Sequence, residues 1–104
     1  MWESLDTCWV KIHFSKTGEI VVAICDSELL GRQLRIRGGH TVKVDKAFYG
    51  GVQVPVDELD KYISKATIIN MLGERCVGYA LKTGLVPTNT VMNVDGIPHI
   101  QVYL

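Results

Sequence analysis

Residues 8–25 read CWVKIHFSKTGEIVVAIC, and this stretch decides which class of fold the chain adopts. Apolar and polar side chains alternate over residues 8–14, which is the pattern of a half-buried strand. Residues 15–18, SKTG, supply turn chemistry, and residues 20–25 are apolar on both faces and rich in β-branched side chains. The stretch therefore predicts a β-hairpin whose second strand lies in the interior of a sheet.

The alternation returns over residues 34–44, on both sides of the glycine pair at 38–39. The pattern predicts that its apolar members face inward, and these are Leu34, Ile36, Val42 and Val44. Just before this segment, Asp26 is expected to cap a short helix over residues 27–30.

The second half of the chain is predicted to be helical and then to return to strands. Asp57 is expected to cap a helix whose apolar side chains recur over residues 59–66, and a second helix is expected over 67–82. Residues 91–104 form two apolar segments around Asp95-Gly96, a dipeptide that favours a tight hairpin. This order predicts an α+β domain with a compact two-layer arrangement, in which two or three helices pack on one face of a mostly antiparallel sheet.

The length and composition fit one small globular domain. Of the 104 residues, 47% are hydrophobic and 21% charged, and we expect a single domain at residues 8–104 behind a short extension, 1–7. Eleven basic and eleven acidic residues cancel, so the overall charge does not demand a nucleic-acid or lipid partner.

The longest apolar run is far shorter than the ~20 residues of a membrane span, and the start lacks a secretory signal. Since three widely spaced cysteines also fit reduced thiols, we predict a cytoplasmic protein that does not associate with membranes.

Basic side chains concentrate in one part of the chain despite the neutral total. Arg35, Arg37 and Lys43 alternate with the apolar positions, so they are expected to share an outward face. Trp9 and Lys11 are expected to face outward on the first strand and to extend that face. Basic groups beside an exposed aromatic ring hold phosphates and stack bases, which indicates a binding module for RNA or a ribonucleoprotein. An ordinary solvated face, or an edge strand protected against aggregation, fits the same residues.

A second group of residues indicates a pocket for a small ligand. Asn70 and Glu74 lie four apart at the edge of the apolar arc of the predicted helix, where buried polar groups need partners. Glu74 or His99 would act there as a general base, and the glycines would let a ligand approach the backbone. The members of this group are Tyr49, Gly50, Gly51, Asn70, Glu74 and His99. The structural alternative is that Asn70 and Glu74 bond only to loop backbone, while His99 lies on a solvated edge strand.

The sequence contains no nucleophile-and-base signature, so we expect a binding protein and keep an enzyme as the alternative. The three histidines and three cysteines lack the spacing of a zinc site, and neither glycine pair, 38–39 or 50–51, matches a nucleotide-binding loop. We therefore predict neither a metal nor a cofactor. A third hypothesis is a subunit interface, in which apolar edge strands pair with a partner or with a second copy in a homo-oligomer.

Several short segments, taken in their order and spacing, point to one family. They are residues 9–13 (WVKIH), 22–26 with 29–31 (VAICD, LLG), 48–51 (FYGG), 66–70 with 73–75 (ATIIN, GER) and 96–99 (GIPH). From about residue 8 to residue 103, the chain resembles the small archaeal family catalogued as domain of unknown function 424. The resemblance implies an archaeal cytoplasmic protein with a compact α+β fold and a link to translation. It implies no enzymatic activity.

Overall fold

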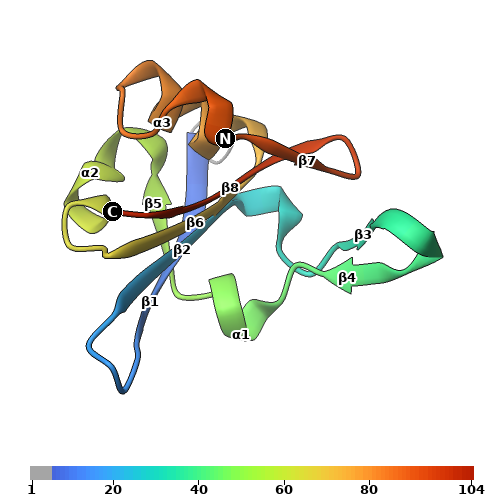
Figure 1. Ribbon diagram of the computed structural model, residues 1–104, viewed down its shortest axis with the longest axis horizontal. Helices are drawn as coiled ribbons and strands as arrows, with labels where there is room; N and C mark the ends of the chain where they lie inside the picture. The colour runs from blue at the N-terminus through green and yellow to red at the C-terminus, as the bar shows by residue number, and fades with distance from the viewer. Residues whose placement is uncertain (1–5) are drawn as a thin grey trace.

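A mixed sheet of six strands forms the centre of the protein, in the order β5-β1-β2-β6-β8-β7 (Figure 1). The structure is a computed structural model that describes residues 6–104, so most of the predicted extension at residues 1–7 lies outside the described residues. The strands of this sheet are β1 (Thr7–Phe14), β2 (Ile20–Asp26), β5 (Val52–Pro55), β6 (Ile68–Leu72), β7 (Met92–Val94) and β8 (Ile97–Tyr103). A separate hairpin contains β3 (Gln33–Arg35) and β4 (Thr41–Lys43).

Short helices connect the strands. The α-helices are α1 (Lys46–Tyr49), α2 (Asp60–Ile63) and α3 (Glu74–Lys82), and the 3₁₀ turns are η2 (Ser27–Leu29), η3 (Arg37–Gly39), η4 (Val56–Glu58) and η5 (Thr88–Thr90). Within residues 6–104, no helix is long and apolar enough to cross a membrane.

Strand pairing follows the two hairpins that the sequence predicts. β1 and β2 pair antiparallel with Val10 opposite Ile24, and β7 and β8 pair antiparallel around the Asp95-Gly96 turn. The two hairpins meet through β6, which pairs antiparallel with β8 and parallel with β2. The predicted class, an α+β fold with a mostly antiparallel sheet, is therefore confirmed, with one parallel pair at its centre.

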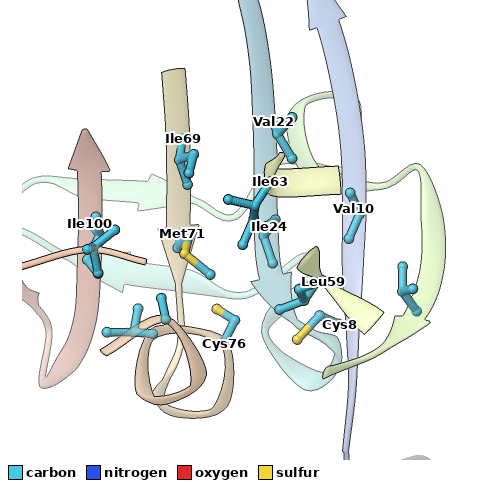
Figure 2. Packing of buried hydrophobic residues seen from close by; sticks show 14 residues of the cluster. Cys8, Val10, Val22, Ile24, Leu59, Ile63, Ile69, Met71, Cys76 and Ile100 are labelled. Carbon is cyan, nitrogen blue, oxygen red and sulfur yellow. The ribbon is translucent and has the colours of Figure 1, made fainter. Parts of the chain in front are cut away.

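The first face of the sheet is sealed by α2 and α3 (Figure 1). Alternate residues of β1, β2, β6 and β8 point into this layer, since successive side chains of a strand face opposite sides. Figure 2 shows the largest of them facing Leu59 and Ile63 from the helical segment. The fully buried aliphatic side chains of the sheet in this cluster are Val22, Ile24, Ile69, Met71 and Ile100.

The second face of the sheet is covered only in part. The short helix α1 lies on it, on the side opposite α2 and α3, and Tyr49 packs there against Ala23, Cys25 and Leu72 (Figure 1). We use "basic arm" for residues 31–44, which contain the hairpin β3–β4 and extend away from the sheet in Figure 1. The base of the arm is closed by hydrogen bonds from the Gly31 N–H to the Val44 carbonyl and from the Val44 N–H to the Arg32 carbonyl.

The predicted helix over residues 67–82 is wrong in its first part. Residues Ile68–Leu72 form β6, and the helix begins only at Glu74. The apolar run lies between β2 and β8, and a short buried strand cannot be distinguished from a helix by periodicity alone. Gly73 ends the strand with φ +125°, a conformation that glycine tolerates and other residues avoid.

Two smaller predictions also need correction. Leu34 and Val44 are buried in the hydrophobic cluster of the second face as expected, but Ile36 and Val42, which lie nearer the turn of the arm, are 40% and 42% exposed. The predicted helix over 59–66 is shorter, with its α-helical part limited to Asp60–Ile63.

Candidate functional site

Tyr49, Asn70 and His99 come together on the second face of the sheet. The Tyr49 hydroxyl donates to Asn70 Oδ1 at 2.6 Å, and His99 Nε2 lies 3.3 Å from the same oxygen. Burial raises the pKa of Tyr49, so the phenol stays protonated and can donate. Burial also lowers the pKa of His99, which favours the neutral ring. The group is therefore an uncharged hydrogen-bonded cluster at neutral pH.

Three separate elements position this cluster. Asn70 lies on β6, His99 lies on the neighbouring strand β8, and Tyr49 reaches across from α1. Helix α1 is fixed by its own cap, because the Asp45 carboxylate accepts from the Ala47 N–H at 2.9 Å. Beside the cluster on β8, Gln101 and Tyr103 alternate with inward-facing residues and are exposed.

Glu74 does not join the cluster. It is the exposed first residue of α3, and α3 packs on the first face, whereas Asn70 and His99 meet Tyr49 on the second. Glu74, one of the two predicted bases, thus lies on a different side of the sheet from the cluster that contains the other, His99. This separation removes the pairing of Glu74 with His99 on which the pocket hypothesis depended.

Gly50 and Gly51 have a packing role in this structure. A side chain at Gly51 would fall on the Val10 carbonyl oxygen, and one at Gly50 would fall on the Lys46 carbonyl. Both glycines therefore allow the segment after α1 to lie directly on backbone, which is the reason for small residues here. That backbone approach involves the protein's own chain rather than a ligand.

Two cations of the basic arm, Arg35 and Lys43, share one face of its hairpin. Gln33 pairs with Lys43 and Arg35 pairs with Thr41, so Arg35 and Lys43 point to the same side, opposite Leu34. Arg37 follows in the turn η3, and all three basic side chains are exposed.

The arm is attached to the tip of the β7–β8 hairpin. The Arg35 N–H donates to Asp95 Oδ2 at 2.9 Å, and Asp95 adopts a left-handed φ of 52° in this turn. A cavity of about 360 Å³ lies at this junction, lined by Arg35, Ile36, Arg37, Asn93, Val94 and Asp95. The arm is thereby held beside the strand that carries His99.

Trp9 and Lys11 lie on β1, and Trp9 belongs to the side chains around the cluster that also contains Leu34 of the arm. Trp9 is half-buried and packs against the hydrophobic cluster that fills the covered part of the second face and includes Tyr49. Farther along β1, His13 stacks on Phe48 with ring centroids 5.0 Å apart and bonds to the Phe48 carbonyl at 2.8 Å. Trp9 thus serves the packing of this face, and its ring is not a free stacking surface.

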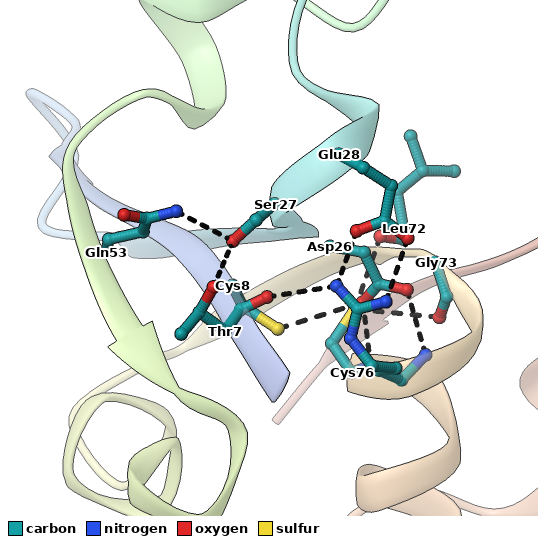
Figure 3. A network of polar contacts seen from close by, with 10 residues as sticks. Thr7, Cys8, Asp26, Ser27, Glu28, Gln53, Leu72, Gly73 and Cys76 are labelled. Atoms are coloured by element: carbon teal, nitrogen blue, oxygen red, sulfur yellow. Dashed lines mark hydrogen bonds and ion pairs between the residues drawn. The ribbon is translucent and has the colours of Figure 1, made fainter. Parts of the chain in front are cut away.

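A buried polar network around Asp26 was not predicted. Asp26 is only 2% exposed, and its carboxylate accepts from the Arg75 and Cys76 N–H groups at 2.9 and 3.0 Å (Figure 3). These are the free N–H groups at the start of α3, so Asp26 caps α3 rather than the turn η2 that follows it in sequence. A side chain at Gly73 would fall on this carboxylate.

Arg75 extends the network to the surface. Its guanidinium forms two hydrogen bonds with the Glu28 carboxylate, one of them 2.8 Å from Nη1 to Oε2, and a third with the Thr7 carbonyl. This pairing lowers the pKa of Glu28 and raises that of Arg75. A cavity of about 770 Å³ lies beside it on the outer side of α3, bordered by Arg75, Gly78, Tyr79, Lys82 and residues 55–57.

Cys8, Asp26 and Cys76 are the buried side chains in the described part of the chain that could hold a metal, with ligand atoms within 4.8 Å of one another. Each of them already has a hydrogen-bonding role. Cys8 donates its S–H to Asp26, and Cys76 donates its S–H to the Leu72 carbonyl at 3.3 Å. Burial raises the pKa of Cys76 well above its ordinary value, which keeps this thiol protonated. We interpret the group as part of the α3 cap.

These features define a small α+β protein with one sealed sheet face, one partly open face and a projecting arm. The chain belongs to the family described as Protein of unknown function (DUF424), whose model matches residues 14–104, and the resemblance expected from the sequence is confirmed. The structure is similar to the crystal structure of an uncharacterized conserved protein from Methanopyrus kandleri. The two share 30% sequence identity and a TM-score of 0.80, covering 93% of this chain and 90% of that one. Among curated proteins, none matches this chain.

Proposed function

We propose that the protein binds single-stranded RNA, without catalysis, through the basic arm and the open part of the second sheet face. The observation that carries the proposal is the segregation of charge. Residues 31–44 contain four basic residues and no acidic one, a net charge of +4 within a neutral chain, so the remainder carries −4. Asp95, which accepts from the Arg35 N–H, offsets one of these charges.

The geometry of the arm suits a phosphate backbone. Arg35 and Lys43 point to one side of the hairpin, Arg37 lies in its turn, and no salt bridge engages any of them within residues 6–104. Guanidinium groups bind phosphate oxygens in pairs, and free cations are attracted to a polyanion without first giving up another partner.

The neighbouring sheet face suits unpaired bases. We use "open strip" for Asn70, His99, Gln101 and Tyr103, the polar and aromatic side chains that β6 and β8 present on the second face. The strip runs along β8 from His99 to Tyr103, away from the Asp95 turn that holds the arm. Tyr103 is 71% exposed, and exposed aromatic rings on a sheet stack bases in many single-strand binders. An acidic protein partner would account for the arm but would leave these side chains without a role.

The test is binding of a fluorescein-labelled 12-nucleotide RNA, followed by anisotropy between 50 and 200 mM KCl. We expect R35A/R37A/K43A to weaken binding and to reduce the slope of log affinity against log salt by about 2, because each phosphate contact contributes ~0.7 in single strands.

The matched control is K61A/K65A/K82A, which removes the same charge from exposed lysines of the helical layer. We expect a much smaller change in slope for this control. Equal losses in both triple variants, or affinity that does not depend on salt, would contradict the proposal.

A further inference from the structure

The Asn70 side chain is held in one orientation by its two neighbours. Its Oδ1 atom accepts from the Tyr49 hydroxyl at 2.6 Å and lies 3.3 Å from His99 Nε2. When His99 carries its proton on Nε2, the ring donates to this oxygen, so both acceptor positions of the amide oxygen are occupied. In that tautomer, turning the amide over would place an N–H group against the His99 donor, so the observed orientation is preferred.

The other end of this amide is free. An asparagine NH₂ group carries two donors, and within residues 6–104 no hydrogen bond engages Asn70 Nδ2. The buried side-chain nitrogen or oxygen atoms without a partner in this part of the chain comprise Arg75 Nε alone, so Asn70 Nδ2 is in contact with solvent. The cluster thus presents a fixed pair of donors, and no acceptor from Asn70, on the second face.

The second face is open to solvent on the Gln101 and Tyr103 side of the amide. Gln101 lies directly opposite Asn70 in the β6–β8 ladder and is exposed, and Tyr103 follows two residues later on the same face. Tyr49 belongs to α1, which begins two residues after the arm ends, and His99 lies on the strand whose turn holds Arg35. A strand of RNA with its phosphates on the arm can therefore place a base on the open strip.

We propose that Asn70, oriented by Tyr49 and His99, selects bases that present a carbonyl oxygen, such as uracil, over adenine in single-stranded RNA. The inference rests on the proposed RNA-binding function and adds a specificity to it. An asparagine recognises adenine by accepting from its amino group and donating to its ring nitrogen, and the first of these bonds cannot form when Oδ1 is already engaged. A carbonyl oxygen needs only donors, which Asn70 retains.

The experiment compares the affinities of labelled rU12 and rA12 for the full chain at 50 mM KCl. We expect the wild type to bind rU12 about tenfold more tightly, as one discriminating base contact allows. Asn70→Asp keeps the shape and the bonds from Tyr49 and His99 but replaces the free donors by an acceptor. The ratio of the two affinities is expected to fall to one or to invert in favour of rA12.

Three further variants separate this effect from charge and folding. Asn89→Asp introduces the same change at an exposed position of η5 and should leave the ratio unchanged. Tyr49→Phe leaves the Asn70 amide free to turn over. The ratio of the rU12 and rA12 affinities should therefore shrink, while the salt dependence of binding stays the same. R35A/R37A/K43A should weaken both RNAs by the same factor.

The outcomes distinguish the two claims. If the wild type binds neither RNA, the proposed function fails and the specificity fails with it. If it binds both with salt dependence but with equal affinity, or with a ratio that Asn70→Asp does not change, the RNA-binding function stands and the role of Asn70 is overturned.

Discussion

Asp26 and Asn70 lie on neighbouring strands but on opposite faces of the sheet, and they differ in whether all their hydrogen-bonding atoms have a partner inside the protein. The Asp26 carboxylate accepts from two backbone N–H groups and a thiol, and Gly73 closes over it. Asn70 has its oxygen saturated and its nitrogen free. A polar group whose hydrogen bonds are all made inside the protein stabilises the fold. A polar group that is held in place but keeps donors without an internal partner is available to a partner molecule.

The largest effect on stability should come from removing the Asp26 carboxylate, whose hydrogen bonds are made inside the protein. Asp26→Ala leaves the first N–H groups of α3 without an acceptor in a buried place, and we expect the free energy of unfolding to fall by about 3 kcal/mol. Urea denaturation followed by circular dichroism measures this change. Glu74→Ala, in the same turn but exposed, should cost less than about 1 kcal/mol. Similar losses for the two variants would show that Asp26 is not the cap that holds α3.

The next effect concerns the glycine that closes over Asp26. Gly73→Ala places a methyl group on the carboxylate at a φ of +125°, and we expect a loss of about 2 kcal/mol in unfolding free energy. Gly78 is the matched control, because it lies inside α3 and a methyl group there would meet nothing within 4 Å. Gly78→Ala should stabilise the protein by up to about 1 kcal/mol, since alanine favours a helix over glycine. A stabilising Gly73→Ala would contradict the close packing of Gly73 on Asp26.

The smallest effect should come from the cluster around Asn70, through the titration of His99. Its pKa is lowered by burial, so the unfolded chain takes up a proton at a higher pH than the folded protein does. Stability is therefore complete above the ordinary histidine pKa of about 6.5 and declines as the pH falls from there toward the lower folded value. His99→Gln keeps a donor for Asn70 without titrating. The difference in unfolding free energy between wild type and variant should change between pH 7 and 5, and a constant difference would exclude this coupling.

The sequence was sufficient for features that depend on local chemistry. The hairpin of residues 8–25 and the Asp95-Gly96 turn follow from alternation and from turn residues, and together they define most of the sheet. The α+β class follows from these two hairpins together with the helix predicted in the second half of the chain. The family could also be predicted, from the order and spacing of several short segments.

Features that depend on residues far apart in the chain could not be predicted from the sequence. Asp26 contacts residues 49 and 50 positions away in the chain, and no local pattern distinguishes such a cap from one for the next turn. The sequence pattern predicts a helix around Asn70, because an apolar run of this length fits the period of a helix and that of a strand, and only the neighbours β2 and β8 decide for a strand. The same pattern places Glu74 beside Asn70 on one helix, whereas the end of β6 at Gly73 separates them.

The parallel pairing of β2 with β6 has a consequence for the order in which the chain folds. Val21 lies opposite Ile68, so the centre of the sheet joins residues far apart in the chain, whereas the β1–β2 and β7–β8 hairpins each need only a tight turn. Closing so long a loop costs chain entropy before any contact compensates for it, so we expect the two hairpins to form first and their joining through β6 to be the slow step. In that order of events, the strand that carries Asn70 gains its partners last, and the open strip forms with it.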